Sequence, residues 1–255
     1  MKSLAKGVAI NVGVNKNREW GGFRGPIFSD GSFEFIHIPW KEKYGIIEPR
    51  PKKYKEMRYS SYVPDRLKNE YVLVSPDFDN CTYASTTYAA ANKPILDLEE
   101  GDFLFFYSTL DFKGERRKRE DGINPNWGAY IVGLFKIDFI KESLRHVLAD
   151  KVAREAFKEY TWFKSLLKLG VRDDGAPWVK GNEKESGLLQ TAIPLSSPNP
   201  DDPQKWNDLA YDLFRTSKGN KLDVNKKAIF QTVLTCEGEC LDKLLAKCIL
   251  RRINR

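Results

Sequence analysis

Two carboxylates lie close together in the first half of the chain, just after an apolar run. Asp77 and Asp79 follow residues 71–74, which are typical of a strand, and Tyr83 comes shortly after them. Carboxylates two residues apart could bind a divalent cation or act as general acid and base. They could equally cap a turn, because Asp and Asn side chains bond their own backbone there. We therefore treat Asp77, Asp79 and Tyr83 as candidate catalytic residues, with turn capping as the alternative.

A second set of side chains suits nucleotide binding. In the predicted strand 8–14, side chains alternate, so Asn11 shares a face with small residues and leaves room for a ligand. Asn11 or Asp77 could bond the edge of a base, while Trp20 and Tyr107 could stack on it. The predicted binding residues of this group are Asn11, Trp20, Arg24 and Tyr107. In the alternative, Trp20 anchors the core and Asn11 satisfies the backbone of a neighbouring loop.

A dense run of positive charge separates two further apolar segments, residues 103–107 and 127–137. The run comprises Arg116, Arg117, Lys118 and Arg119. We predict a solvated loop between two strands whose cationic side chains touch phosphates. A solvated charged loop without any ligand is the alternative.

Charge and composition narrow the classes of partner. The net charge of +7 favours nucleic acid or a nucleotide, although 35 acidic residues leave a generally basic surface as the alternative. The four cysteines and two histidines match no zinc spacing, so we expect reduced thiols and no metal site built from them. The sequence leaves the identity of any cofactor open. Walker A, nucleophile-elbow, dinucleotide and zincin motifs are missing from the sequence. No apolar run has the length of a membrane span, and the start lacks a signal-peptide core, so we expect a cytoplasmic protein.

The pattern of apolar residues predicts an α+β fold in a single domain, residues 1–255. The β-rich half is about 1–138 and the helix-rich half about 139–255. Strands are expected at 8–14, 32–38, 71–74, 103–107 and 127–137. Helices are expected at 140–148, 152–169, 206–216 and 241–253. We expect a mostly antiparallel sheet or partial barrel with the helices packed on one side.

Several ordered motifs resemble the nucleotide modification associated domain 3 family. They are VAINVGV at 8–14, GPIFSDGSFEFIHIP at 25–39, SPDF at 75–78 with Thr82 and Tyr83, and GDFLFFY at 101–107. The resemblance covers most of the chain, to about residue 195. It implies a place near systems that modify bases in nucleic acid.

The segment from the Gly101-Asp102 turn to the Ile131-Val132-Gly133 strand is also similar to PUA-like domains, including the EVE and ASCH groups. That likeness implies a PUA-like sheet and binding of RNA or modified DNA bases, often with a base in an aromatic pocket. The leading hypothesis is a nucleic-acid or nucleotide-binding protein associated with base modification or modified-base recognition. The alternatives are a metal-dependent enzyme acting on a nucleotide or nucleobase, and a protein-interaction scaffold. The sequence leaves the oligomeric state open, and also the choice among DNA, RNA and free nucleotide.

Overall fold

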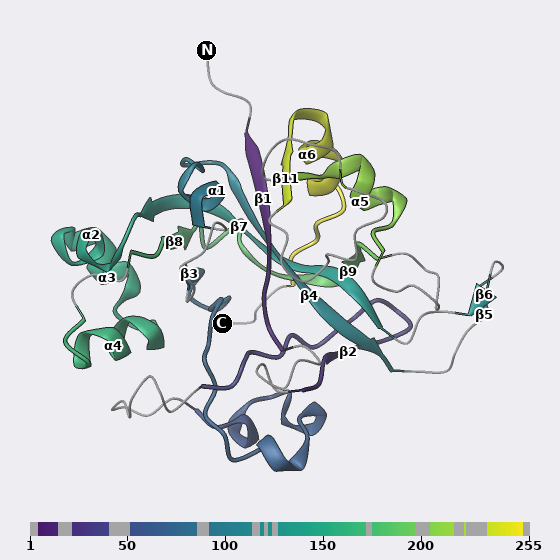
Figure 1. Cartoon of the computed structure of the whole chain (residues 1–255), viewed down its shortest axis with the longest axis horizontal. Coiled ribbons are helices and arrows are strands. Elements are labelled where there is room, and N and C mark those ends of the chain that lie inside the picture. The colour runs from purple at the N-terminus through teal and green to yellow at the C-terminus, as the bar shows by residue number, and fades with distance from the viewer. Residues whose placement is uncertain are drawn as a thin grey trace.

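The computed structural model of the chain is an open mixed sheet with two groups of helices (Figure 1). It describes residues 5–14, 22–40, 52–85, 92–113, 118–119, 122–123, 127–171, 175–196, 205–216, 222 and 234–251. The strands of the main sheet are β1 (Lys6–Asn11), β2 (Gly25–Ile27), β3 (Thr82–Ala84), β4 (Phe103–Phe112), β7 (Trp127–Lys141), β8 (Trp178–Gly181), β9 (Gly187–Pro194), β10 (Arg215–Thr216) and β11 (Leu234–Glu237). A separate hairpin joins β5 (Lys118–Arg119) to β6 (Gly122–Ile123).

The strand order is β10-β11-β1-β4-β7-β8-β3, with β2 also paired to β4 and β9 to β7. Only two of the described pairings are parallel, those of β1 and β2 with β4. The predicted α+β class and the mostly antiparallel sheet are therefore confirmed. Strands β8 to β11 come from the half of the chain for which mainly helices were expected.

The two parallel strands lie one after the other along the same edge of β4. Strand β1 pairs with residues 103–107 and β2 with residues 110–112, while β7 occupies the other edge. The chain leaves the sheet after Asn11 and returns at Gly25. Gly13 permits this departure, because its φ is +80° and a Cβ there would lie 2.7 Å from the Phe35 ring. The pairing of β4 along this edge is consequently interrupted beside Ser108 and Thr109.

The two faces of β4 have different neighbours because side chains alternate along a strand. Phe106 packs against Phe78 and Phe135, with ring centroids 5.4 and 4.7 Å away. Tyr107 points to the opposite face, where its ring centroid lies 6.2 Å from that of Trp206.

The helices are α1 (Asn92–Leu96), α2 (Leu144–Ala149), α3 (Lys151–Phe157), α4 (Thr161–Lys168), α5 (Asp208–Leu213) and α6 (Gly238–Leu245). Helices α2 to α4 surround Trp178 of β8, whose ring centroid is 5.2 Å from that of Phe157 and 5.8 Å from that of Phe163. Helices α5 and α6 lie near β11 and β1 instead (Figure 1). The two groups of helices pack on different core clusters, α2 to α4 on the cluster around Trp178 and α5 and α6 on the main cluster of the sheet.

Several helices and strands begin or end at positions that the spacing of apolar residues did not predict. The predicted helix 152–169 is two helices, and the Asp150 carboxylate starts the first by accepting hydrogen bonds from Val152 N and Ala153 N. Residues 32–38 are not an extended ladder strand but contact β2 through one bridge between Ile27 and Phe33. Short 3₁₀ turns occupy Tyr54–Glu56, Ser60–Tyr62 and Asp65–Leu67. Within the described residues, no helix has the length and apolar character needed to cross a bilayer.

Candidate functional site

The interruption between β1 and β2 gathers polar side chains on one face of β4. Asn11 pairs with Tyr107 in the sheet register, and Arg24 precedes the residue that pairs with Leu110, which places it beside Thr109. Tyr107, Thr109 and Asp111 alternate onto this same face, and Asp111 lies opposite Trp127 of β7. We call the set Asn11, Arg24, Tyr107, Thr109, Asp111 and Trp127 the strand break.

Arg24 is the cation of the strand break. Its Nη1 donates to Asp111 Oδ1 at 3.1 Å, and its Cζ lies 3.8 Å from the centroid of the Trp127 ring. Burial lowers the pKa of Arg24, while the Asp111 carboxylate opposes that change. Only 7% of Arg24 is exposed, and its Nε has no hydrogen-bond partner among the described residues. The guanidinium is thus stacked and charge-paired, yet one of its donors is left over.

Asn11 and Tyr107 meet as the sequence predicts, but with a different role for the ring. Their side chains are hydrogen-bonded, and burial raises the pKa of Tyr107. Tyr107 is 0% exposed, so its ring offers no open face for a base. In the described part of the chain, Asn11 Nδ2 and Thr109 Oγ1 are buried without partners. Tyr107 therefore positions Asn11 and does not stack on a ligand in this conformation.

Three members of the strand break were not predicted: Thr109, Asp111 and Trp127. Alternation from Tyr107 gives a signal for Thr109 and Asp111, because every second residue of a strand shares a face. Trp127 had no such local signal, since only the antiparallel register of β4 and β7 brings it opposite Asp111.

Asp77 and Asp79 lie in a tight turn between Asp77 and Thr82, which we call the Asp77 turn. The Asp77 Oδ1 accepts hydrogen bonds from Asp79 N and Asn80 N, both at 3.1 Å, and its Oδ2 accepts one from Asn80 Nδ2 at 2.8 Å. Burial raises the pKa of Asp77, and these hydrogen bonds oppose the increase. The geometry supports the turn-capping alternative. Over the described ranges, no group of three or more His, Cys, Asp or Glu side chains could hold a metal ion.

Tyr83 follows the Asp77 turn on β3 and is partly buried. Burial raises its pKa to about 12, and a hydrogen bond with Ser85 opposes the increase. The neighbouring Tyr160 hydroxyl donates to Ser75 Oγ at 2.7 Å and accepts from Ala84 N at 3.1 Å. These contacts fix β3 against the helices.

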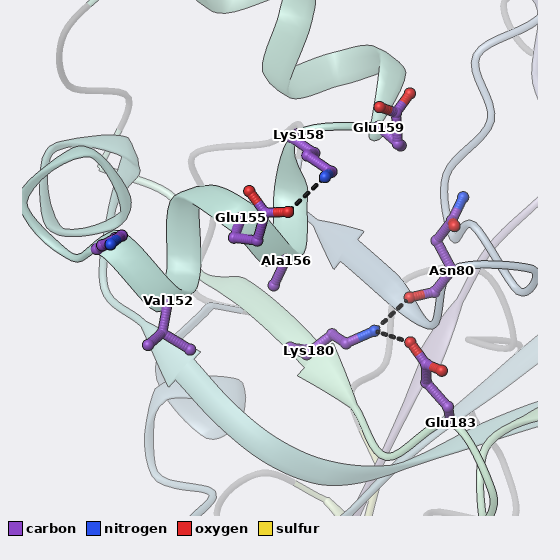
Figure 2. A pocket seen from close by; sticks show the side chains of 9 residues that line it. Asn80, Val152, Glu155, Ala156, Lys158, Glu159, Lys180 and Glu183 are labelled. Atoms are coloured by element: carbon purple, nitrogen blue, oxygen red, sulfur yellow. Dashed lines mark hydrogen bonds and ion pairs between the residues drawn. The ribbon is translucent and has the colours of Figure 1, made fainter.

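A cavity of about 700 Å³ opens beside the Asp77 turn (Figure 2). Lys180 lies at its base, and the Nζ donates to Asn80 O at 2.7 Å and to Glu183 Oε1 at 3.2 Å. Val152 and Ala156 of α3 form an apolar part of the wall (Figure 2). Lysines and glutamates are equally numerous in the lining, which is Asn80, Lys151, Val152, Glu155, Ala156, Lys158, Glu159, Lys180 and Glu183. The cavity therefore has no excess of either charge.

The structure does not bring all the predicted residues together. Phe78 of the Asp77 turn packs on the Phe106 face of β4, whereas Tyr107 points to the other face. Asp77 and Tyr107 therefore line different regions. Trp20, Arg116 and Arg117 lie outside the described residues, as do the side chains of Lys118 and Arg119.

Comparison with known proteins gives one match. The family model described as nucleotide modification associated domain 3 matches residues 6–234. No curated protein matches the chain. No solved structure matches it either.

Proposed function

Because the chain belongs to the nucleotide modification associated domain 3 family, we propose that it binds a nucleobase, free or within nucleic acid, at the strand break. The observation that carries the proposal is a group of buried polar atoms without described partners: Asn11 Nδ2, Arg24 Nε and Thr109 Oγ1. Buried polar groups are nearly always hydrogen-bonded in folded proteins, so three neighbouring exceptions on one face favour a ligand. The protein then acts in the modification of a base or in recognition of a modified one.

The Asp77 turn supports no matching proposal of catalysis. Both Asp77 oxygens already accept hydrogen bonds from the turn. The PUA-like likeness remains a prediction, and we infer the bound base from the strand break alone.

The test is to measure binding and melting side by side on single variants of the full chain. Asn11→Ala and Trp20→Ala are each expected to weaken nucleoside or oligonucleotide binding while the melting temperature changes little. Stacking alone contributes roughly 1–3 kcal/mol per base, which a binding isotherm detects. Asn182→Ala is the matched control, since Asn182 lies in a turn elsewhere and accepts from Lys184 N. If binding falls only in proportion to the folded fraction, the residues are structural and the proposal fails.

Substitutions in the run of positive charge at residues 116–119 test whether the bound base is part of a nucleic acid. Replacing Arg116, Arg117, Lys118 and Arg119 with Ser is expected to weaken oligonucleotide binding and flatten its salt dependence, because each lost phosphate contact reduces the salt slope by about 0.9 on duplex DNA. Free nucleosides should bind as before. Unchanged oligonucleotide binding at every salt concentration would remove these residues from the interface.

A further inference from the structure

We infer that Arg251 is a positioning residue for the strand break, because it holds β2 so that Arg24 stays stacked on Trp127. The inference rests on the proposed function and deepens it by naming a residue that acts on the ligand through Arg24. Arg251 lies beyond residues 6–234, the part of the chain that the family model matches. The strand break therefore depends on a segment outside the matched residues.

The first step concerns the edge of β2 that is not paired with β4. The chain turns back after β2 and runs along this edge, where Glu34 N donates to Pro26 O at 3.1 Å. The fit is close, because a Cβ on Gly25 would lie 2.4 Å from Glu34 O. A shift of Glu34 therefore moves β2, and with it Arg24, which directly precedes the strand.

The second step concerns the contacts that Arg251 makes with this returning segment. Its Nη2 donates to Phe33 O at 2.7 Å, and its Cζ lies 5.0 Å from the centroid of the Phe33 ring. Its Nη1 lies 3.9 Å from Glu34 Oε2, and Arg58 Nη2 lies 3.5 Å from the same oxygen. Burial lowers the pKa of Arg251, and the Glu34 carboxylate opposes that change. One guanidinium thus contacts the backbone, the ring and the carboxylate of two consecutive residues.

The third step concerns what holds Arg251 itself. Its backbone N donates to Leu188 O of β9 at 2.7 Å, and Gln190 N of β9 donates to Ile249 O at 2.7 Å. Strand β9 is paired with β7, the strand that begins at Trp127. The Arg251 side chain therefore joins the pair β9 and β7, which carries Trp127, to the segment that fixes β2.

The contacts of Arg24 depend on the position of β2. Its Cζ lies 3.8 Å from the centroid of the Trp127 ring, and its Nη1 lies 3.1 Å from Asp111 Oδ1. Such a hydrogen bond is lost when the two atoms move a few tenths of an ångström apart or out of line. Strand β2 is only three residues long, so the contacts on its other edge contribute much of what fixes its position.

The first test measures the surroundings of Arg24 without any ligand. Nuclear magnetic resonance of the full chain detects the Nε–H groups of arginines, and the ring current of Trp127 shifts the signal of Arg24 away from those of exposed arginines. The Arg24→Lys variant identifies this signal by its loss. We expect Arg251→Ala to move the signal towards the exposed arginines. The variant should stay folded, since Ala192 N of β9 still donates to Gly31 O at 3.0 Å.

The second test is calorimetric titration with a nucleoside that binds the wild type. Arg251→Ala should weaken binding by about two- to thirtyfold, the range for residues that act on a site without touching its ligand. Arg251→Lys keeps a cation beside Glu34 and should recover part of the affinity. Adding Arg251→Ala to Arg24→Lys should cause no further loss, because residues that act through one contact are not additive. Arg154→Ala is the matched control for both tests, since Arg154 is exposed on α3.

The outcomes separate the inference from the proposed function. If the Arg24 signal does not move in Arg251→Ala, the inference is overturned and the proposed function stands. The same holds if the signal moves while the nucleoside affinity stays at the wild-type value, or if Arg251→Ala weakens binding by the same factor in the wild type and in Arg24→Lys. If Arg251→Ala does not fold, Arg251→Lys repeats both measurements, and an unmoved signal there overturns the inference as well. If no nucleoside binds the wild type, the proposed function fails together with the inference.

Discussion

Asp77 and Arg24 are buried to the same extent, each with 7% of its surface exposed, yet their surroundings differ. The Asp77 carboxylate accepts three hydrogen bonds from its own turn. The Arg24 guanidinium has one carboxylate partner, one aromatic ring and a donor that no described residue satisfies. Polar groups that are fully satisfied within the chain stabilise the fold, whereas unsatisfied ones become favourable only when a ligand completes them.

The two regions also differ in what supports them. The Asp77 turn is supported by His37, whose Nε2 is 3.1 Å from Pro76 O and whose Nδ1 is 2.9 Å from the Tyr59 hydroxyl. Because a carbonyl only accepts, Nε2–H donates to Pro76 O. Burial lowers the pKa of His37, so the ring is neutral at pH 7 and its unprotonated Nδ1 accepts from the Tyr59 hydroxyl. The residues of the strand break are positioned instead by the strand register of β4 with β1, β2 and β7. We therefore expect substitutions near the turn to change stability and those at the strand break to change binding.

The largest expected effect is a loss of stability in acid caused by His37. Burial lowers the pKa of His37 to about 4, below the 6.5 of an exposed imidazole. Above pH 6.5 the ring is neutral in both states and its contribution is complete. Between pH 6.5 and 4 the unfolded chain binds a proton that the native state does not, so stability falls by about 3 kcal/mol in total. Urea unfolding measured across this pH range should show the slope.

His37→Gln should flatten that slope, because Gln can donate and accept but does not titrate in this range. His146→Gln is the control, since His146 is exposed on α2 and should leave the slope unchanged. Burial raises the pKa of Asp77, which contributes with the opposite sign, but it does so equally in both variants. If the free energy of unfolding has the same pH slope in wild type and His37→Gln, His37 does not cause the loss of stability in acid.

The next effect concerns the Asp77 turn itself. Asp77→Ala leaves the amides of Asp79 and Asn80 without their acceptor and should lower the free energy of unfolding by about 2–4 kcal/mol. Asp65→Ala is the control, because that exposed carboxylate pairs only with Lys68 and should give no measurable change. Urea unfolding at pH 7 compares the two variants. Nucleoside binding should decrease in Asp77→Ala only with the folded fraction.

The alternative of a cation at Asp77 and Asp79 makes a different prediction. Magnesium, manganese or calcium would raise the melting temperature of the wild type, and Asp77→Asn would abolish that rise while keeping the fold. If none of these ions changes the melting temperature, Asp77 remains a turn residue. If one of these ions raises the melting temperature, the contrast between the two regions no longer holds, because both regions would then bind a ligand.

How well the sequence predicts each region depends on how far apart along the chain its contacting residues lie. Asp77 bonds residues two and three positions away, and such local capping is visible in the residue types alone. Arg24 and Asp111 are 87 residues apart, so their pairing depends on how β2 aligns on β4. The local pattern predicts Asn11 and Arg24 as binding residues, and alternation places Asp111 on the face of Tyr107, but no local pattern predicts Trp127 as their neighbour.

The fold shows the same division. The apolar runs of β4 and β7 predict two central strands. Both extend further than expected, because residues 108–111 of β4 still pair with β7 and residues 139–141 of β7 pair with β8. The tandem placement of β1 and β2 along one edge of β4 is a long-range feature that no local periodicity encodes. The strand break exists only because of that placement.

The smallest expected effect separates the regions most sharply, because each contains one buried threonine hydroxyl without a described partner. Thr109 is 1% exposed at the strand break and Thr82 is 0% exposed at the Asp77 turn. Replacing either with Val removes an unsatisfied polar atom at nearly constant shape, which should raise the free energy of unfolding by about 1 kcal/mol. Only Thr109→Val should also weaken nucleoside binding, since only that hydroxyl belongs to the strand break.

Urea unfolding without ligand and calorimetric titration with a nucleoside that binds the wild type measure both properties on the same two proteins. A destabilised Thr109→Val would show that the hydroxyl is already bonded in the native state, so that the strand break has no vacancy there. Equal losses of nucleoside affinity in Thr109→Val and Thr82→Val would show that the ligand does not distinguish the two regions. We expect both variants to gain stability and only Thr109→Val to lose binding. An unsatisfied hydroxyl at a binding site requires this result, because the group that destabilises the free protein stabilises the complex.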